Sequence, residues 1–411
     1  MTMAPSAAAA AGFSATPFET RVTQGFAWAL FVGLWGKLLV AVLLTQPVID
    51  AEADSVYNRL ADVALLGVLF AGLATYADAI LQRAPLMLVA VPLGLASFLT
   101  TEVLTGLKFS TAVFEYLKIV TPALISVLLQ RIFEREPALV IRLLQLTLGL
   151  VWTLAIGGLV VLPPSLNRGG ELFWPVYFAS LHTSSYLIVV CAALALYLFE
   201  AGRLGRRLFV ALLLFSVVLV FYGWGVRTSM VAALAFGAVV LVQRTRLAPV
   251  AMFVALAVGL ALAFMPLLFG LIHLPSWDEM VELTSGRFSM WVQKIDILAN
   301  SSLFEWLFGH GEGSDWIVSE VWWWSAKDSH NDFIRLLNQQ GLLGLGAVIG
   351  VLVVWAGCFP RGVALPLLAA LVASTAFSNG IMFRPQAGLI MPLALVAATA
   401  AWQRRQPGAH R

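Results

Sequence analysis

The chain has 411 residues, of which 60% are hydrophobic and 11% are charged. A soluble domain usually has about a quarter charged residues and under half apolar residues, so this composition excludes a water-soluble enzyme. The net charge of +3 comes from singly scattered basic residues, which argues against a nucleic-acid partner. The apolar runs do not alternate with polar residues, as the strands of a membrane β-barrel would. The sequence therefore predicts an all-α polytopic membrane protein.

About twelve apolar runs are each long enough to cross roughly 30 Å of hydrocarbon as a helix. They lie near residues 25–45, 60–81, 86–105, 111–131, 138–162, 176–199, 208–226, 229–243, 248–273, 333–356, 363–380 and 386–402. They divide the chain into a flexible cytoplasmic leader at 1–24, transmembrane helices 1–9 at 25–273, a Trp-rich loop at 274–332, transmembrane helices 10–12 at 333–402 and a cytoplasmic tail at 403–411.

Most arginines fall in alternate loops between the predicted spans, as Arg83, Arg203 and Arg361 illustrate. Positively charged loops face the cytoplasm in multi-pass membrane proteins. We therefore expect both termini in the cytoplasm and the loop at 274–332 on the other side of the membrane. No Lys or Arg precedes Arg21, so the leader lacks the basic start of a signal peptide.

Tryptophan is concentrated in the loop at 274–332, which holds half of the 14 tryptophans of the chain, including the run Trp322, Trp323 and Trp324. Such residues can form an aromatic belt that places the loop on the lipid headgroups. They can also offer flat surfaces on which the apolar faces of sugars pack. Both interpretations stay open.

Neither a cysteine framework nor a metal site is indicated. Cys191 and Cys358 lie far apart in or beside apolar runs, without the spacing of zinc ligands. Loop acids are the only candidate ligands for a divalent cation, and no histidine accompanies them: Asp50, Glu52, Asp54, Asp278, Glu279 and Glu282. Acidic loops are also what the positive-inside bias leaves on the far side of the membrane. We therefore expect no cofactor and no catalytic metal.

A tight turn between two predicted spans carries Arg227, within the run at 222–229. Gly223 and Gly225 in this run permit close approach of a ligand, and a guanidinium binds phosphate through two parallel hydrogen bonds. The turn therefore indicates a phosphate-binding residue at the membrane surface, with anchoring to lipid headgroups as the alternative.

Arg287 lies in the loop at 274–332, where Thr284 or Ser285 is expected to cap a helix that begins near Gly286. The first turn of a helix favours acidic residues, so the helix dipole does not explain an arginine there. Arg287 is therefore expected to face an anion, either from the protein or from a ligand.

A histidine stands at the predicted start of the tenth span. Asp328 or Ser329 is expected to cap a helix that then enters the membrane. At roughly 100° per residue, His330, Gly341 and Gly344 share one face of that helix. The histidine would lie at the membrane surface, and the glycines would admit a closely packed neighbouring helix.

Further polar residues flank this histidine. Asn331 and Arg335 belong to a polar stripe at the top of the span, and Lys327 precedes it. A charged side chain at membrane depth is costly, so such residues face a cavity or a partner. In another span Glu115 and Lys118 form an i, i+3 pair, and we expect them to neutralise each other.

The pair His330-Asn331, followed by nine residues and then Gly341-x-x-Gly344, resembles the H-[NSQ]-x9-G-x-x-G signature of the O-antigen ligase family of Gram-negative envelopes. The resemblance extends to the runs at 285–291 and 309–313 and to a topology of about twelve spans with one long loop before this helix. Motifs cover about residues 210–345, and the topology covers the whole chain. O-antigen polymerases and protein-directed oligosaccharyl ligases share much of this pattern.

The resemblance implies a membrane glycosyltransferase of GT-C-like architecture, multi-pass in the bacterial inner membrane, with a periplasmic active site. Its activity would be transfer of a glycan from undecaprenyl diphosphate to a sugar hydroxyl of lipid A–core in lipopolysaccharide biosynthesis, without a metal and with inversion. His330 would be the catalytic base, and Arg227 and Arg287 would bind the donor diphosphate. The residues given supporting roles are Asn331, Lys327, Arg335, Gly341 and Gly344.

The residue types suit this chemistry on their own, because histidine titrates near neutrality and arginines stabilise a diphosphate leaving group. Two alternatives stay open. An O-antigen polymerase or protein O-oligosaccharyltransferase would use the same donor with another acceptor. A flippase for a lipid-linked sugar would move the lipid without chemistry, and it predicts charged residues along a midplane path. The candidate residues instead gather at one face of the membrane, which favours surface chemistry.

Overall fold

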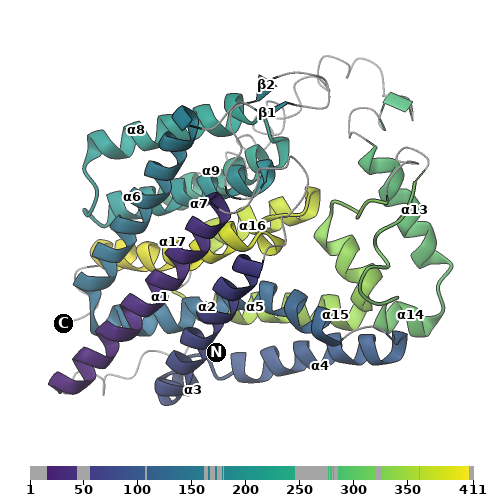
Figure 1. Cartoon of the computed structure of the whole chain (residues 1–411), viewed down its shortest axis with the longest axis horizontal. Coiled ribbons are helices and arrows are strands. Elements are labelled where there is room, and N and C mark those ends of the chain that lie inside the picture. The colour runs from purple at the N-terminus through teal and green to yellow at the C-terminus, as the bar shows by residue number, and fades with distance from the viewer. Residues whose placement is uncertain are drawn as a thin grey trace.

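The computed structural model describes residues 16–43, 56–106, 109–161, 165–166, 172–173, 178, 180–245, 276, 278–279, 281, 286–319, 326–360 and 362–406. Within these residues, 10 helices are long and apolar enough to cross a membrane (Figure 1). The chain is therefore a multi-pass α-helical membrane protein, as its composition predicts. The long helices are α1 (Pro17–Leu43), α2 (Val56–Thr75), α4 (Met87–Thr105), α5 (Phe109–Arg135), α6 (Pro137–Val161), α7 (Leu181–Glu200), α8 (Arg206–Val217) with its π-helical extension η2 (Val218–Gly223), α9 (Arg227–Thr245), α15 (Asp332–Gly357) and α17 (Pro385–Arg405).

The shorter elements connect or flank the long helices. They are α3 (Ala77–Arg83), α13 (Arg287–Ala299), α14 (Leu303–Phe308), α16 (Leu365–Phe377), the 3-10 helix η3 (Ile381–Phe383) and the paired two-residue strands β1 (Ser165–Leu166) and β2 (Leu172–Phe173). The predicted span at 363–380 corresponds to α16, which has 13 residues. The predicted span at 248–273 and the run at 322–324 lie outside the described residues.

The first helix begins earlier than the sequence predicts. The Thr16 hydroxyl accepts a hydrogen bond from the Glu19 backbone N–H at 3.2 Å, and the Glu19 carboxylate accepts one from the Thr16 backbone N–H at 2.9 Å. This reciprocal pair is a capping box, and Pro17 between its members suits the first helical position. Residues 17–24, which we expected in the leader, are therefore the first turns of α1.

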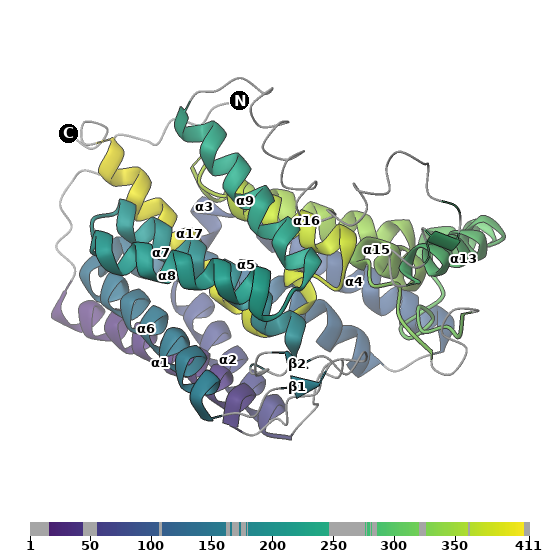
Figure 2. The ribbon, with the colours of Figure 1, turned by 90° about the horizontal axis from the view of Figure 1, so that it is seen from above.

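The core of the bundle is built around α7 and α17, which lie side by side (Figure 2). Both helices are apolar on all sides and rich in small residues, so they are buried by their neighbours and their backbones approach closely. Around them, α16 packs on α9, α15 packs on α4, and α1 packs on α2.

The helices end at two faces, which we call the loop face and the arginine face. At the loop face α7, α9, α15 and α17 begin and α16 ends, and the Asn331 side chain before α15 donates to the Ala376 carbonyl of α16 at 2.8 Å. At the arginine face α7, α9 and α17 end, and Glu200 of α7 forms ion pairs with Arg244 and Arg405. Helices α13 and α14 project beyond one end of the bundle, next to α15 (Figure 1).

Candidate functional site

His330 adopts an uncommon backbone conformation at the loop face. Its φ is +47°, a left-handed value that few residues other than glycine adopt and that is concentrated at functional sites. Its imidazole Nδ1 lies 3.1 Å from Oδ1 of Asp328, and the histidine side chain is 27% exposed. Asn379 donates a hydrogen bond to the other carboxylate oxygen of Asp328. The imidazole is thus oriented by a carboxylate that is itself held in place.

Asp328 remains ionised although it is buried. Burial alone would raise the pKa of Asp328, but the charges of His330 and Arg335 and the hydrogen bond from Asn379 outweigh it and lower that pKa. A carboxylate beside Nδ1 fixes the tautomer of an imidazole and stabilises the protonated ring. In this arrangement Nε2 is the nitrogen that can accept a proton from a bound hydroxyl.

A second histidine and two arginines accompany His330. His182 lies in the first turn of α7. It interacts electrostatically with the charges of Arg384, Arg287 and His330. Arg384 precedes α17, and its Nη1 donates to the hydroxyl of the residue that caps α7 at 3.4 Å. Arg287 begins α13, and its Nη1 donates to the last carbonyl of α16 at 3.5 Å. Two guanidinium groups near two imidazoles form a cluster suited to an anionic ligand.

Arg287 occupies the helix start that the sequence predicts, with a different cap. Helix α13 begins at Arg287, and Gly286 is the N-cap residue, with φ of +79° and no side-chain hydrogen bond. Only a glycine adopts this conformation readily. Thr284 and Ser285, the expected caps, lie outside the described residues.

Arg227 lies at the loop face, at the start of α9, and its side chain is exposed. The next residue, Thr228, accepts a hydrogen bond at 2.7 Å from the hydroxyl of Tyr186, one turn along α7 from His182. The charges of the two site arginines also act on the Tyr186 hydroxyl. Arg227 therefore begins its helix at the same face as the cluster and is more exposed than Arg287.

Asn331 caps α15, in place of the expected Asp328 or Ser329. Its side-chain oxygen accepts hydrogen bonds from the backbone N–H groups of Phe333 and Ile334, both at 3.1 Å. Its amide nitrogen is occupied by the contact with α16 described above. Asn331 thus fixes where α15 begins relative to α16, and His330 lies just outside the helix.

A buried ion pair supports the segment before His330. Lys294 of α13 and Asp315 are both fully buried, with Nζ and Oδ1 2.9 Å apart. Burial lowers the pKa of Lys294, and the charge of Asp315 opposes that change. Asp315 accepts a hydrogen bond from the Ser329 backbone N–H at 2.7 Å, and the Trp291 indole donates to the Ser329 carbonyl at 2.6 Å. Trp291 of α13 and Asp315, which is itself paired with α13, therefore hold the two backbone groups of Ser329, next to His330.

Arg335, which we expected to support the site, is engaged by two carboxylates next to it. Its Nη2 lies 3.1 Å from Oε2 of Glu115 and 3.2 Å from Oε1 of Glu312, and its guanidinium lies over the ring of Phe383 at 4.7 Å. Two carboxylates already balance this charge. Glu115 also forms the expected pair with Lys118, at 2.6 Å.

Gly341 interrupts α15, so the predicted single face does not exist. Its φ of 63° and ψ of −170° are non-helical values within that helix. A Cβ atom at Gly341 would overlap the Leu307 carbonyl and the backbone nitrogen of Gly309. The backbone N–H groups of His310 and Gly311 donate to α15 carbonyls at this break, at 2.8 and 2.9 Å. The glycine therefore admits the end of α14 and the following loop.

The other predicted supporting residues have different surroundings. Gly344 faces α4, where a Cβ atom would lie 3.8 Å from the Phe98 ring and would overlap the side chain of Gln340. This contact agrees with the expected close approach of a neighbouring helix. Lys327 is half-buried and pairs with Ile317 through two backbone hydrogen bonds, at 2.9 and 3.1 Å.

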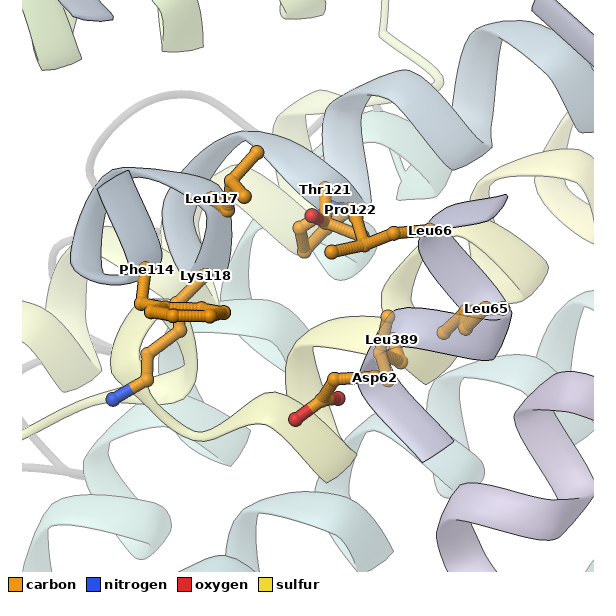
Figure 3. A pocket seen from close by; sticks show the side chains of 9 residues that line it. All are labelled: Asp62, Leu65, Leu66, Phe114, Leu117, Lys118, Thr121, Pro122 and Leu389. Atoms are coloured by element: carbon orange, nitrogen blue, oxygen red, sulfur yellow. The ribbon is translucent and has the colours of Figure 1, made fainter. Parts of the chain in front are cut away.

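An apolar groove opens between α2, α5 and α17 (Figure 3). About 520 Å³ of space lies within it, part of it open to the surroundings, and leucines, Phe114 and Pro122 form most of its walls. Lys118 and Asp62 lie toward one edge, and Asp62 is paired with Lys37 at 2.7 Å. The groove therefore combines a hydrocarbon-like wall with one lysine.

Sequence reasoning missed His182, Arg384 and the role of Asp328. A signal was present for Arg384, because basic residues are rare in the loops that we placed outside the cytoplasm. His182 begins a predicted span that opens on the same side. Each is a single residue in an undistinguished run, and the fold alone brings them to His330.

Among the described residues, no group of three or more His, Cys, Asp or Glu side chains is arranged to hold a metal ion. The loop acids at 50–54 and Glu282 lie outside those residues. Comparison with known proteins adds no assignment, because no protein-family model matches the sequence and no curated protein matches it.

Proposed function

We propose that the chain is an O-antigen ligase, which transfers a glycan from undecaprenyl diphosphate to a sugar hydroxyl of lipid A–core. The observation that carries the proposal is the cluster of His330, Asp328, Arg287 and Arg384 at one face of a multi-pass helical bundle. It combines a base with phosphate-binding groups where membrane helices end. The site would face the periplasm, at the inner membrane.

His330 acts as the base in this proposal. Its Nε2 accepts the proton of the acceptor hydroxyl while that oxygen forms a bond to the anomeric carbon of the donor. The bond from the anomeric carbon to the diphosphate oxygen breaks, and undecaprenyl diphosphate leaves with the electron pair. Asp328 stabilises the imidazolium. A single displacement of this kind inverts the anomeric configuration.

The diphosphate is bound by arginines in this proposal. Arg287 and Arg384 act on the same region around His182, and Arg227 begins α9 at the same face. Guanidinium groups bind phosphate oxygens in pairs and stabilise the charge that develops as the bond breaks. The scheme requires no metal, so we expect activity to survive EDTA.

The groove between α2, α5 and α17 is suited to the hydrocarbon tail of the donor. Lys118 at its edge is paired with Glu115, which also contacts Arg335 near the start of α15. Leu389 in its wall lies in α17, five residues after Arg384. A tail in the groove would thus lead toward the arginines. A tryptophan at Leu117 would fill the groove, and we expect Leu117→Trp to raise the KM for the lipid-linked donor.

The experiment that tests the function is transfer in vitro by the purified protein. An undecaprenyl-diphosphate glycan and purified lipid A–core are incubated with wild type, His330→Ala, Arg227→Ala or Arg287→Ala, and the acceptor is followed by its mobility. We expect product with the wild type, and loss of product with each variant at unchanged membrane insertion.

The same assay separates the alternatives. Lengthening of the glycan on its own lipid carrier, without a shift of lipid A–core, would identify a polymerase. Transfer to a protein acceptor would identify a protein O-oligosaccharyltransferase. Absence of every product, with movement of the donor across vesicles, would identify a flippase. Loss of activity in EDTA with recovery on adding a divalent cation would contradict the metal-free scheme.

A further inference from the structure

A pocket lies at the arginine face, remote from the His330 cluster. It is formed where α7, α9 and α17 end and α16 begins, and it covers about 700 Å³ of space, part of it open to the surroundings. Its polar wall includes Tyr197, Arg244 and Arg405, and its apolar wall includes Val240 and Trp402. Because these residues occupy the last turns of membrane helices, the pocket opens at the depth of the lipid headgroups.

The arginines of the pocket carry excess positive charge. Arg244 and Arg405 each use Nη2 to contact one oxygen of the Glu200 carboxylate, and Arg404 donates to the Glu200 carbonyl at 3.2 Å. Among the described residues, one carboxylate therefore balances one of these three guanidinium charges. A guanidinium has five N–H donors, so one contact to Glu200 leaves donors on Arg244 and on Arg405 that can bind an anion.

A second, independent observation concerns a buried hydroxyl in the pocket, which has no hydrogen-bond acceptor among the described residues. Tyr197 is 6% exposed and lines the pocket, and its hydroxyl has no hydrogen-bond partner among the described residues. The charges of Arg244 and Arg405 act on this hydroxyl. Buried polar groups in proteins are almost always hydrogen-bonded, so an unpaired hydroxyl beside two arginines indicates a ligand that accepts hydrogen bonds.

We propose that this pocket binds the phosphate of an anionic phospholipid, with Arg244 and Arg405 contacting the phosphate oxygens and Tyr197 donating a hydrogen bond to them. The Val240 and Trp402 side chains form the wall along which the first part of an acyl chain lies. Basic pockets between membrane helices are typical sites for anionic lipid headgroups. A soluble anion would leave that apolar wall uncovered, which favours a lipid over free phosphate.

Binding is measured by native mass spectrometry of the full-length protein purified in detergent. The protein is titrated with phosphatidylglycerol and separately with phosphatidylcholine, which has the same phosphate but no net charge. We expect wild type to bind phosphatidylglycerol about tenfold more tightly or better, as contacts with a charged group usually provide. Millimolar inorganic phosphate is not expected to displace the lipid.

The decisive variant is Tyr197→Phe, which removes only the unpaired hydroxyl and keeps every intramolecular contact described for that residue. A purely structural tyrosine would lose nothing, whereas the proposal predicts about tenfold weaker binding of phosphatidylglycerol. Arg405→Gln should weaken binding similarly. Arg207→Gln is the matched control, because Arg207 is an exposed arginine at the same face and outside the pocket.

Four results would overturn the proposal. Equal affinity for the two lipids would show that the arginines do not select an anion. Unchanged affinity in Tyr197→Phe, or an equal loss in Arg207→Gln, would show that the pocket is not the site. Displacement of the lipid by inorganic phosphate would show that the pocket binds the soluble anion. None of these results bears on His330, so this test is independent of the proposed transferase activity.

Discussion

The Nδ1 atom of His330 lies 3.1 Å from Oδ1 of Asp328, two residues earlier in the chain. The backbone of His330 is left-handed, and its N–H lies 3.4 Å from the same Asp328 oxygen. A strained conformation persists where the surrounding structure imposes it, and here the caps of α15 and the contacts of Ser329 do so. We therefore expect His330 and Asp328 to act together as a pair.

The first prediction concerns this pair. His330→Ala should lower transfer by about 100-fold or more, the usual contribution of a general base, while the protein stays folded in the membrane. Asp328→Asn should lower it by about tenfold or more, because the amide replaces one of the two oxygens that face His330 and Asn379 with an NH2 group, which is itself a donor. The measurement is kcat/KM with a fluorescent acceptor, beside thermal unfolding. Asp296→Asn, an exposed acid on α13, is the control. Equal activity of Asp328→Asn and wild type would remove Asp328 from the mechanism.

The second prediction separates charge from geometry at the arginines. Arg287→Lys and Arg384→Lys keep the charge and remove the planar pair of donors that matches a phosphate. We expect kcat/KM for the donor to fall about 10- to 100-fold in each, in line with the loss of a hydrogen bond to a charged group. Arg206→Lys at the exposed start of α8 serves as the control. Full activity of either site variant would show that a point charge suffices.

The helices could be predicted well from the sequence, because a membrane span is recognisable from its apolar composition and its length alone. The start of α13 after Gly286 and the Glu115–Lys118 pair were also predictable, since both depend on residues close together in the chain. Local rules of capping and of i, i+3 contacts determine such features.

The cluster itself could not be predicted, because its members meet only through packing. His182 and Arg384 begin different helices, and a lone charged residue at a span end has the same pattern as a headgroup anchor. The partners of Arg335 could not be predicted for the same reason. One of its partners, Glu115, is 220 residues away, so no local pattern shows that its charge is already balanced.

The third prediction concerns two glycines that face each other. At Gly309 a Cβ atom would overlap the backbone at Gln339 and Gln340, and at Gly341 it would overlap the end of α14. Both have positive φ, and Gly341 lies in a region of φ and ψ that is essentially restricted to glycine. Gly309→Ala and Gly341→Ala should each cost about 3 kcal/mol or more, seen as a lower Tm and a lower yield of folded protein.

The control for these glycines is Gly346→Ala in the same helix, where nothing lies within 4 Å of the added atom. Alanine is favoured over glycine in a helix by up to about 1 kcal/mol, so the Tm should stay or rise. Similar losses at Gly341 and Gly346 would mean that α15 is continuous and that its break carries no packing role.

The fourth prediction concerns Glu312, whose side chain is 13% exposed and contacts Arg335. Burial raises the pKa of Glu312 to about 7, the nearby charges of Glu115 and Glu102 add to this change, and Arg335 opposes it. Below the ordinary value of 4.5 the folded and unfolded chains both hold the proton, and between 4.5 and about 7 only the folded chain keeps it. The stability contributed by protonated Glu312 is therefore present at low pH and is lost as the pH rises through about 7.

We accordingly expect the Tm of the purified protein, followed by tryptophan fluorescence, to fall between pH 5 and pH 8. Glu312→Gln keeps a neutral hydrogen-bonding side chain beside Arg335 and cannot titrate. Across this range the Tm of the variant should therefore fall less than that of the wild type, by a difference of about 2 °C or more. Glu305→Gln is the matched control. Hydrogen bonds from the Ser302 backbone and hydroxyl lower the pKa of Glu305, so it stays ionised throughout the range. Parallel curves for wild type and Glu312→Gln would show that another group is responsible for the pH dependence.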